Sequence, residues 1–283
     1  MSFRCDKTRA MNPEKTIKSI CCAAFGALLV LGSARTAGAS ERRFTYTYES
    51  ATLGKGEREI EPWNTVRVGR TGFYAGVDSR LEVEVGLTDR LQTSVYLNLS
   101  GANEDVTLPN GQKAREASMR HGGVSSEWKY KLLDPVADPL GLALYVELTM
   151  APTEAAVETK LILDKRFRNL LIAGNVVGEY EADFETRPTG HETFLEVDLG
   201  VAYFVSQAVS LGIEGRSDNE VGEEWEWSAL FAGPVAGYST EGWWATLSVL
   251  PQLANLHRQP NTPHLELSDH ERVNARLIFG AHF

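Results

Sequence analysis

Cysteine is scarce in this sequence of 283 residues, and the three cysteines, Cys5, Cys21 and Cys22, all stand near its start. The rest of the chain cannot form disulfides, so backbone pairing and packing must hold its fold. Long hydrophobic runs are also missing: beyond residue 39, no segment reaches the roughly 18 consecutive apolar residues of a membrane-spanning helix. No glycine-rich phosphate loop precedes a predicted helix, which leaves nucleotide binding without support.

Basic residues are fewer than acidic ones, 28 against 38. The balance becomes more acidic when residues 1–39 are removed, as the sequence leads us to expect. Lys15 and Lys18 precede an apolar run of 13 residues over 20–32, and Ala37 and Ala39 form an A-x-A cleavage site. A membrane-spanning helix needs roughly 20 apolar residues, so we expect residues 1–39 to be a secretory signal peptide. Its loss changes the formal net charge from −10 to −14. Nucleic-acid binding requires a basic surface, so nucleic acid is excluded as a partner.

The dominant pattern beyond residue 54 is strict alternation of apolar and polar residues, which predicts β-strands. Leu81, Val83 and Val85, for example, alternate with Glu82 and Glu84. Twelve such segments are expected, near residues 55–69, 76–88, 90–101, 118–132, 140–151, 156–167, 169–183, 191–205, 207–217, 224–237, 242–254 and 268–283. The sequence therefore predicts an all-β fold.

The expected architecture is a closed antiparallel barrel over residues 55–283, with an N-terminal arm over residues 40–54 lying inside it. Residues 41–52 could instead form a thirteenth strand, but bacterial membrane barrels have even strand counts, which leaves 10 or 14 as the alternatives to 12. Short turns alternate along the chain with longer polar connections such as 102–117 and 255–267. Short turns on one side and longer loops on the other are typical of an outer-membrane barrel.

Alternation alone does not say whether the apolar face meets a packed core or lipid. Aromatic residues near the strand ends favour lipid, because such girdles mark the membrane interfaces. They lie near the predicted periplasmic ends (Tyr130, Phe167, Tyr203, Tyr238, Trp243, Phe283) and the outer ends (Tyr180, Trp225, Trp227). We therefore expect a transmembrane barrel in the cell outer membrane of a Gram-negative bacterium, with outer-membrane lipid as a partner.

The last predicted strand resembles the C-terminal signal of bacterial outer-membrane proteins, an amphipathic strand that ends in phenylalanine. Apolar residues stand at every second position: Val273, Ala275, Leu277, Phe279, Ala281 and Phe283. The resemblance implies recognition by the barrel-assembly machinery during biogenesis. In layout, residues 52–63 and 84–98 also resemble uncharacterised outer-membrane β-barrels of proteobacteria, although residue 54 is Gly where such proteins are expected to have Pro. That resemblance implies no activity.

The face that would line the barrel is rich in charge, with more acids than bases. Its candidate lumen-lining residues are Glu82, Glu84, Glu127, Lys129, Glu147, Glu158, Lys160, Glu196, Asp198, Glu214, Arg216, Arg272 and Arg276. Buried charges must be paired or hydrated, so these residues form either ion-pair ladders or the wall of a water-filled pore. The sequence predicts a narrow passive pore for small polar or cationic solutes, with a plugged structural barrel as the alternative.

Catalytic and metal-binding signals are weak. Ser268 and His270 share one face of a strand, and with Asp218 and Asp269 they suggest a hydrolase site at the extracellular rim as a further alternative. No His-x-Ser motif is present, so no catalytic residue is assigned. The five histidines at the predicted outer side lack the close spacing of metal ligands, so neither a metal site nor a cofactor is expected.

Overall fold

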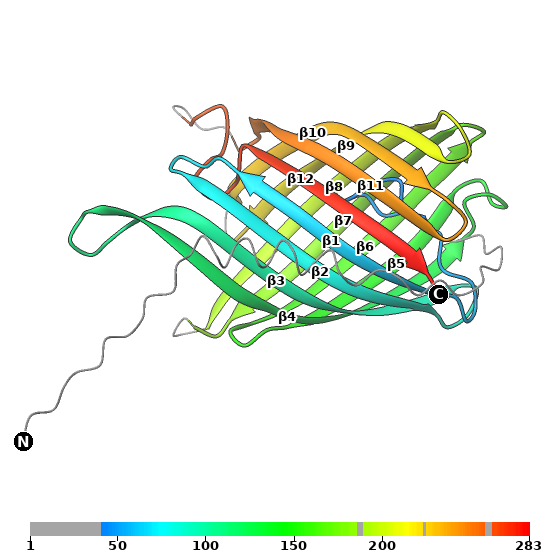
Figure 1. Cartoon of the computed structure of the whole chain (residues 1–283), viewed down its shortest axis with the longest axis horizontal. Helices are drawn as coiled ribbons and strands as arrows, with labels where there is room; N and C mark the ends of the chain where they lie inside the picture. Colours follow the sequence, from blue (N-terminus) through cyan, green and yellow to red (C-terminus); the bar gives the residue numbers. More distant parts are fainter. Residues whose placement is uncertain (1–40, 186–188, 223–224, 258–261) are drawn as a thin grey trace, which may run out of the picture. The chain divides into compact units, whose positions relative to one another are not determined.

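The computed structural model describes residues 41–185, 189–222, 225–257 and 262–283, so the predicted signal peptide, with Ala37 and Ala39, lies outside the described residues. Twelve β-strands close into one antiparallel barrel, as predicted (Figure 1). They are β1 Arg58–Val68, β2 Tyr74–Gly86, β3 Leu91–Thr107, β4 Lys113–Leu133, β5 Gly141–Met150, β6 Glu154–Phe167, β7 Leu170–Asp183, β8 Gly190–Phe204, β9 Val209–Val221, β10 Trp225–Ser239, β11 Trp243–Asn255 and β12 Val273–His282. In the part of the chain described, no helix is long and apolar enough to cross a membrane.

The alternating sequence gives the barrel wall two different faces, because successive side chains of a strand point to opposite sides. On β2, Leu81 and Val83 are 46% and 41% exposed, whereas Glu82 and Glu84 beside them are 0% and 5% exposed. Each of the twelve strands carries at least one exposed large apolar side chain. The outer face is therefore apolar and the inner face polar, the reverse of a water-soluble barrel.

The two ends of the barrel differ in their connections. At one end, the short-turn end, residues 87–90, 168–169 and 205–208 join successive strands. β1 begins and β12 ends at this same end, where the two strands pair and close the barrel. The opposite end, the loop end, holds the longest connection, 256–272.

Two connections differ from the predicted ones. β3 and β4 extend through most of 102–117, because polar cross-strand pairs continue the ladder: Asp105 faces Arg115 and accepts a hydrogen bond of 3.1 Å from it. Figure 1 shows this hairpin reaching past the neighbouring strands. β12 starts at Val273 rather than near 268, because Glu266 accepts the backbone amides of Ser268, Asp269 and His270 and folds that segment into a turn.

The N-terminal arm, residues 41–54, crosses the barrel interior without forming a strand, which confirms the predicted arm. Phe44 and Leu53 are 0% exposed, although the arm belongs to no sheet. Two wall glycines make room for it. A Cβ atom at Gly86 would lie 2.1 Å from the carbonyl oxygen of Gly54, and one at Gly200 would lie 2.6 Å from the Phe44 ring. Any side chain at these positions would collide with the arm.

Candidate functional site

The inner face of the wall carries the charged residues that the sequence singled out. Twelve of the thirteen candidates are buried or half-buried: Glu82, Glu84, Glu127, Lys129, Glu147, Glu158, Lys160, Glu196, Asp198, Glu214, Arg216 and Arg276. The arm divides them into two groups. One group lines a cavity on the loop-end side of the arm, and the other contacts the arm or lies on its short-turn side.

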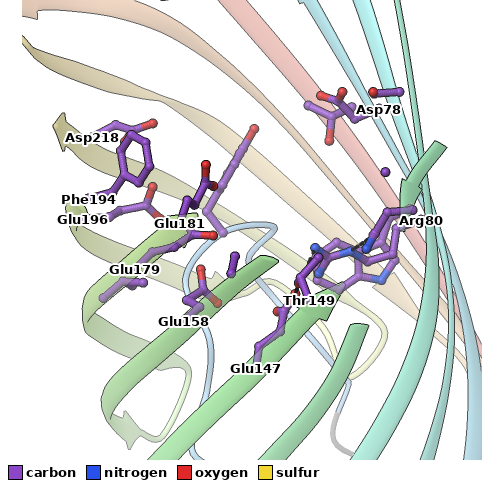
Figure 2. Close-up of a pocket in the computed structure, with 18 of the residues that line it drawn as sticks. Asp78, Arg80, Glu147, Thr149, Glu158, Glu179, Glu181, Phe194, Glu196 and Asp218 are labelled. Carbon is purple, nitrogen blue, oxygen red and sulfur yellow. Dashed lines mark hydrogen bonds and ion pairs between the residues drawn. The ribbon is translucent and has the colours of Figure 1, made fainter. Parts of the chain in front are cut away.

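The main cavity has a volume of about 460 Å³ and lies among the strand halves next to the loop end. Tyr46 and Tyr48 of the arm form its floor, and Phe194 and Trp227 add aromatic surface to its sides. Figure 2 shows Glu147, Glu158 and Glu179 directed into it, with Arg80 across from them. Its acidic lining residues, Asp78, Glu147, Glu154, Glu158, Glu179, Glu181, Glu196 and Asp218, outnumber its basic ones, Arg80, Lys160, Arg216 and Arg276, by two to one.

The basic side chains of the cavity are already engaged. Lys160 Nζ lies 2.9 Å from Glu158, and Arg216 bridges Glu196 and Asp218. The guanidinium of Arg276 stacks 3.6 Å above the Tyr46 ring, a cation–π contact.

Two cavity acids have no such partner. Among the described residues, no Lys or Arg nitrogen lies within 4.0 Å of Glu179 or Glu181, and both carboxyls line the cavity. The cavity therefore combines carboxyl groups that have no basic partner with aromatic faces. This combination suits a cation, which is attracted both by carboxylates and by the faces of aromatic rings.

One wall residue, Glu214 of β9, holds the arm. Its Oε1 atom accepts the backbone amides of Tyr46 and Thr47, each at 2.7 Å. Its Oε2 atom accepts the backbone amide and the hydroxyl of Thr45, at 3.1 and 2.9 Å. Hydrogen bonds to an ionised acceptor are stronger than neutral ones, so Glu214 is the principal anchor of the arm.

Further anchors continue along the arm toward β3. The side-chain amide of Asn175 accepts from the Tyr48 backbone N–H at 2.6 Å and donates to the Tyr48 carbonyl at 3.0 Å, in the manner of a strand partner. Gln92 accepts the backbone amide of Leu53 at 2.9 Å. Within the arm, Glu49 accepts the Arg43 amide at 2.8 Å, and burial raises the pKa of Glu49 to about 7.

Arg272, which was also predicted to line the lumen, stands one residue before β12, and its side chain is exposed. Its backbone amide donates to the carbonyls of Val68 and Gly69, next to the start of β12. One sequence-based assignment, that of Trp227, is wrong. Trp227 was expected in an outer aromatic girdle, but it lines the cavity. Trp227 lies on the same face of β10 as the buried Ala229 and Phe231, and its pairing with β9 is regular from Trp227 onward, so alternation itself directs it inward.

The residues of the suggested hydrolase site do not form a catalytic arrangement in the described structure. No hydrogen bond joins Ser268 to His270 there, since the amides of both are held by Glu266. The His270 ring packs edge-on against Trp227, with 4.1 Å between ring centroids, and burial lowers its pKa to about 4. Asp218 is paired with Arg216.

Nothing in the sequence indicated that the arm would be the floor of a cavity. Thr45 and Thr47 alternate with Phe44, Tyr46 and Tyr48, but this pattern does not predict their contacts, because the arm conformation depends on wall residues far along the chain. The only available signal was the apolar set Phe44, Tyr46 and Tyr48, which indicates burial without showing against what.

Comparison with known proteins gives a family and a fold. Residues 36–283 match the model of a family of unknown function, DUF6662. No curated protein matches the chain. Its fold is similar to that of the COG4313 outer membrane channel from Pseudomonas putida F1, with a TM-score of 0.60 and 11% identity over 85% of this chain and 100% of that one. It is also similar to the NanC porin, with a TM-score of 0.52 and 10% identity over 79% and 99% of the two chains. At these identities the likeness concerns the fold.

Proposed function

The chain belongs to the DUF6662 family of unknown function, and we propose that it is an outer-membrane channel that passes small polar or cationic solutes passively. The membrane location is supported by the outer face of the wall. Exposed large apolar side chains are present on every strand, and exposed aromatic residues such as Tyr130, Phe167 and Tyr203 lie near the short-turn end. Such a belt would be unstable in water and is stable against lipid.

The observation that carries the channel proposal is the acidic cavity above the arm. Its volume of about 460 Å³ falls in the range of small-molecule sites, roughly 300–1,000 Å³. Glu179 and Glu181 supply carboxyl groups without a basic partner, while Tyr46 and Trp227 supply aromatic faces. A small solute with a cationic group is the ligand that this chemistry favours.

The arm lies between this cavity and the short-turn end, so solutes pass only when the arm leaves its place. We place the short-turn end in the periplasm, as is usual for outer-membrane barrels. The arm then acts as a plug whose release opens the channel. A permanently plugged structural barrel is the second candidate, and the four hydrogen bonds that Glu214 accepts from the arm favour it.

Single-channel recording in planar bilayers under a salt gradient tests the proposal. We expect folded wild-type protein to show brief openings with a reversal potential on the cation-selective side. The double variant Glu179→Gln, Glu181→Gln should move that potential toward zero. Glu116→Gln, at an exposed position on β4, is the matched control and should leave it unchanged.

The outcomes separate the two candidates. If neither the wild-type barrel nor one with a weakened arm anchor (Glu214→Gln) conducts, although both are folded by their heat-shifted mobility in gels, the channel is refuted and the structural barrel remains. Conduction without any effect of Glu179 and Glu181 would refute the assigned solute class.

A further inference from the structure

A second acidic region lies on the short-turn side of the arm, separate from the cavity. Glu59 and Glu61 of β1, Glu82 and Glu84 of β2, and Glu127 of β4 are each no more than 5% exposed. Glu59 is directly opposite Glu84 in the β1–β2 register, and Glu61 is directly opposite Glu82. Like charges in directly opposed positions destabilise a sheet, so this region needs compensation.

Basic side chains supply that compensation only from a distance, through Arg42 and Lys129. In the described residues, no Lys or Arg nitrogen comes within 4.0 Å of any of these five carboxylates. Neutral donors satisfy part of the region: the indoles of Trp244 and Trp63 donate to Glu59 and Glu61. His282 Nδ1 lies 3.4 Å from Glu59.

Glu82 and Glu127 stand apart from the others in their hydrogen bonding. In the described structure, both carboxylate oxygens of each residue are buried without a partner at hydrogen-bonding geometry, although the Ser94 hydroxyl interacts with Glu82 outside that geometry. The Oε2 atom of Glu84 accepts a hydrogen bond of 2.7 Å from the side-chain amide of Gln92, which leaves the other carboxylate oxygen of Glu84 free. Carboxylate oxygens of Glu82, Glu84 and Glu127 lie within 4.8 Å of one another. Three carboxylates therefore converge from two strands on one buried point.

We propose that Glu82, Glu84 and Glu127 bind one divalent cation, Ca²⁺ in preference to Mg²⁺ or a transition metal. Ca²⁺ binds oxygen ligands at roughly 2.3–2.6 Å, so the oxygens around it are separated by at most about 5 Å, as here. Buried carboxylates are stable when they are paired or coordinate a metal. The ligand set contains oxygen alone, whereas zinc and its neighbours prefer nitrogen or sulfur.

The space beside the cluster favours calcium over magnesium. A cavity of about 10 Å³ lies between the arm and the wall. The arm borders it with Arg42 and Tyr48, and the wall with Glu61, Glu84 and Lys129. That volume suits about one water molecule. Mg²⁺ holds several of its waters in a strict octahedron, whereas Ca²⁺ accepts irregular sets of protein oxygens.

A bound cation would tie β2 to β4 across the intervening β3, directly under the arm. Because only the folded barrel brings these carboxylates together, ligand binding should stabilise it. We expect the unfolding temperature of the metal-free barrel to rise when Ca²⁺ is added. This proposal does not depend on conduction and holds equally for a channel or a plugged barrel.

Calorimetric titration of the full-length, detergent-folded protein with CaCl₂, after treatment with EDTA, tests the site. We expect one Ca²⁺ per chain, at least tenfold weaker binding of Mg²⁺, and at least a tenfold loss of Ca²⁺ affinity in Glu82→Gln and in Glu127→Gln. Glu116→Gln removes an exposed carboxylate that also faces a glutamate, Glu104, and should bind as wild type does.

The wild-type titration is decisive even if a variant fails to fold. The proposal is overturned if wild-type protein binds no stoichiometric Ca²⁺, which would mean that protons neutralise the cluster. Equal binding by wild type and a folded Glu127→Gln variant, or an equal loss in Glu116→Gln, would also overturn it.

Discussion

Replacing Glu214 by glutamine should release the arm from the barrel. The two carboxylate oxygens accept four hydrogen bonds, from Thr45 (two), Tyr46 and Thr47. Glutamine has the same shape, but it replaces one oxygen by an NH₂ group, which is a donor and faces other donors. One or two of the four bonds are therefore lost, because the Thr45 hydroxyl can turn and accept from the NH₂ group, and the remaining bonds lose their charge assistance.

The size of the effect follows from those bonds. A hydrogen bond to a charged group contributes about 1.5–3 kcal/mol, so losing one or two weakens docking by about 1.5–6 kcal/mol. With about 1.4 kcal/mol per factor of ten, the docking equilibrium falls by roughly 10–10⁴. Reversing a 99:1 preference requires about 5.5 kcal/mol, so the upper part of this range would leave the arm mostly undocked.

Limited trypsin digestion of the folded barrel measures arm release directly. Arg42 and Arg43 are each 9% exposed in the docked arm, so wild type should resist cleavage there. Glu214→Gln should be cut at these sites at least about tenfold faster and should open far more often in bilayers. Glu116→Gln controls for the loss of a carboxylate. Unchanged cleavage in a folded Glu214→Gln barrel would refute the view that Glu214 anchors the arm.

Two further perturbations should act on the same equilibrium. Burial raises the pKa of Glu49, which lies beside Arg42, Arg43 and Asp164, from 4.5 to about 7. Between these two pH values, docking of the arm is therefore accompanied by uptake of a proton. Docking should be strongest below pH 4.5 and should weaken as the pH rises to 7. Trypsin itself is more active at pH 8, so cleavage is compared with that of an unfolded peptide substrate at the same pH. Relative to that substrate, cleavage at Arg42 and Arg43 should be faster at pH 8 than at pH 5, and Glu49→Gln should reduce that difference. A difference that persists in full would assign it to other carboxyls. Gly86→Ala places a Cβ atom 2.1 Å from the Gly54 carbonyl oxygen, so it should loosen the arm and speed cleavage, whereas Gly242→Ala, which meets nothing within 4 Å, should not.

The strands and their faces were predictable because both follow from a period of two. Leu81 and Glu82 are adjacent in sequence, and alternation alone placed one outside and the other inside. The same rule places Trp227 inside, on the face of Ala229 and Phe231, and its assignment to the girdle failed because it followed nearness to the strand end and not the face. The start of β12 was not predictable, because the turn before it depends on Glu266.

The contents of the interior were not predictable, because they depend on which inward residues meet across the barrel. Alternation gives Glu82 and Glu127 the same face, but only the register of β2, β3 and β4 brings their carboxylates together. Likewise, nothing in the sequence distinguishes Glu214 from the other inward acids. It differs from them because the arm passes within hydrogen-bonding distance of it. Inward acids of one sequence class thus have three different environments: open to a cavity at Glu179, capped by arm amides at Glu214, and unsatisfied at Glu127. Since unsatisfied buried charge costs the most, the Glu127 region is where a missing partner has the largest effect on stability.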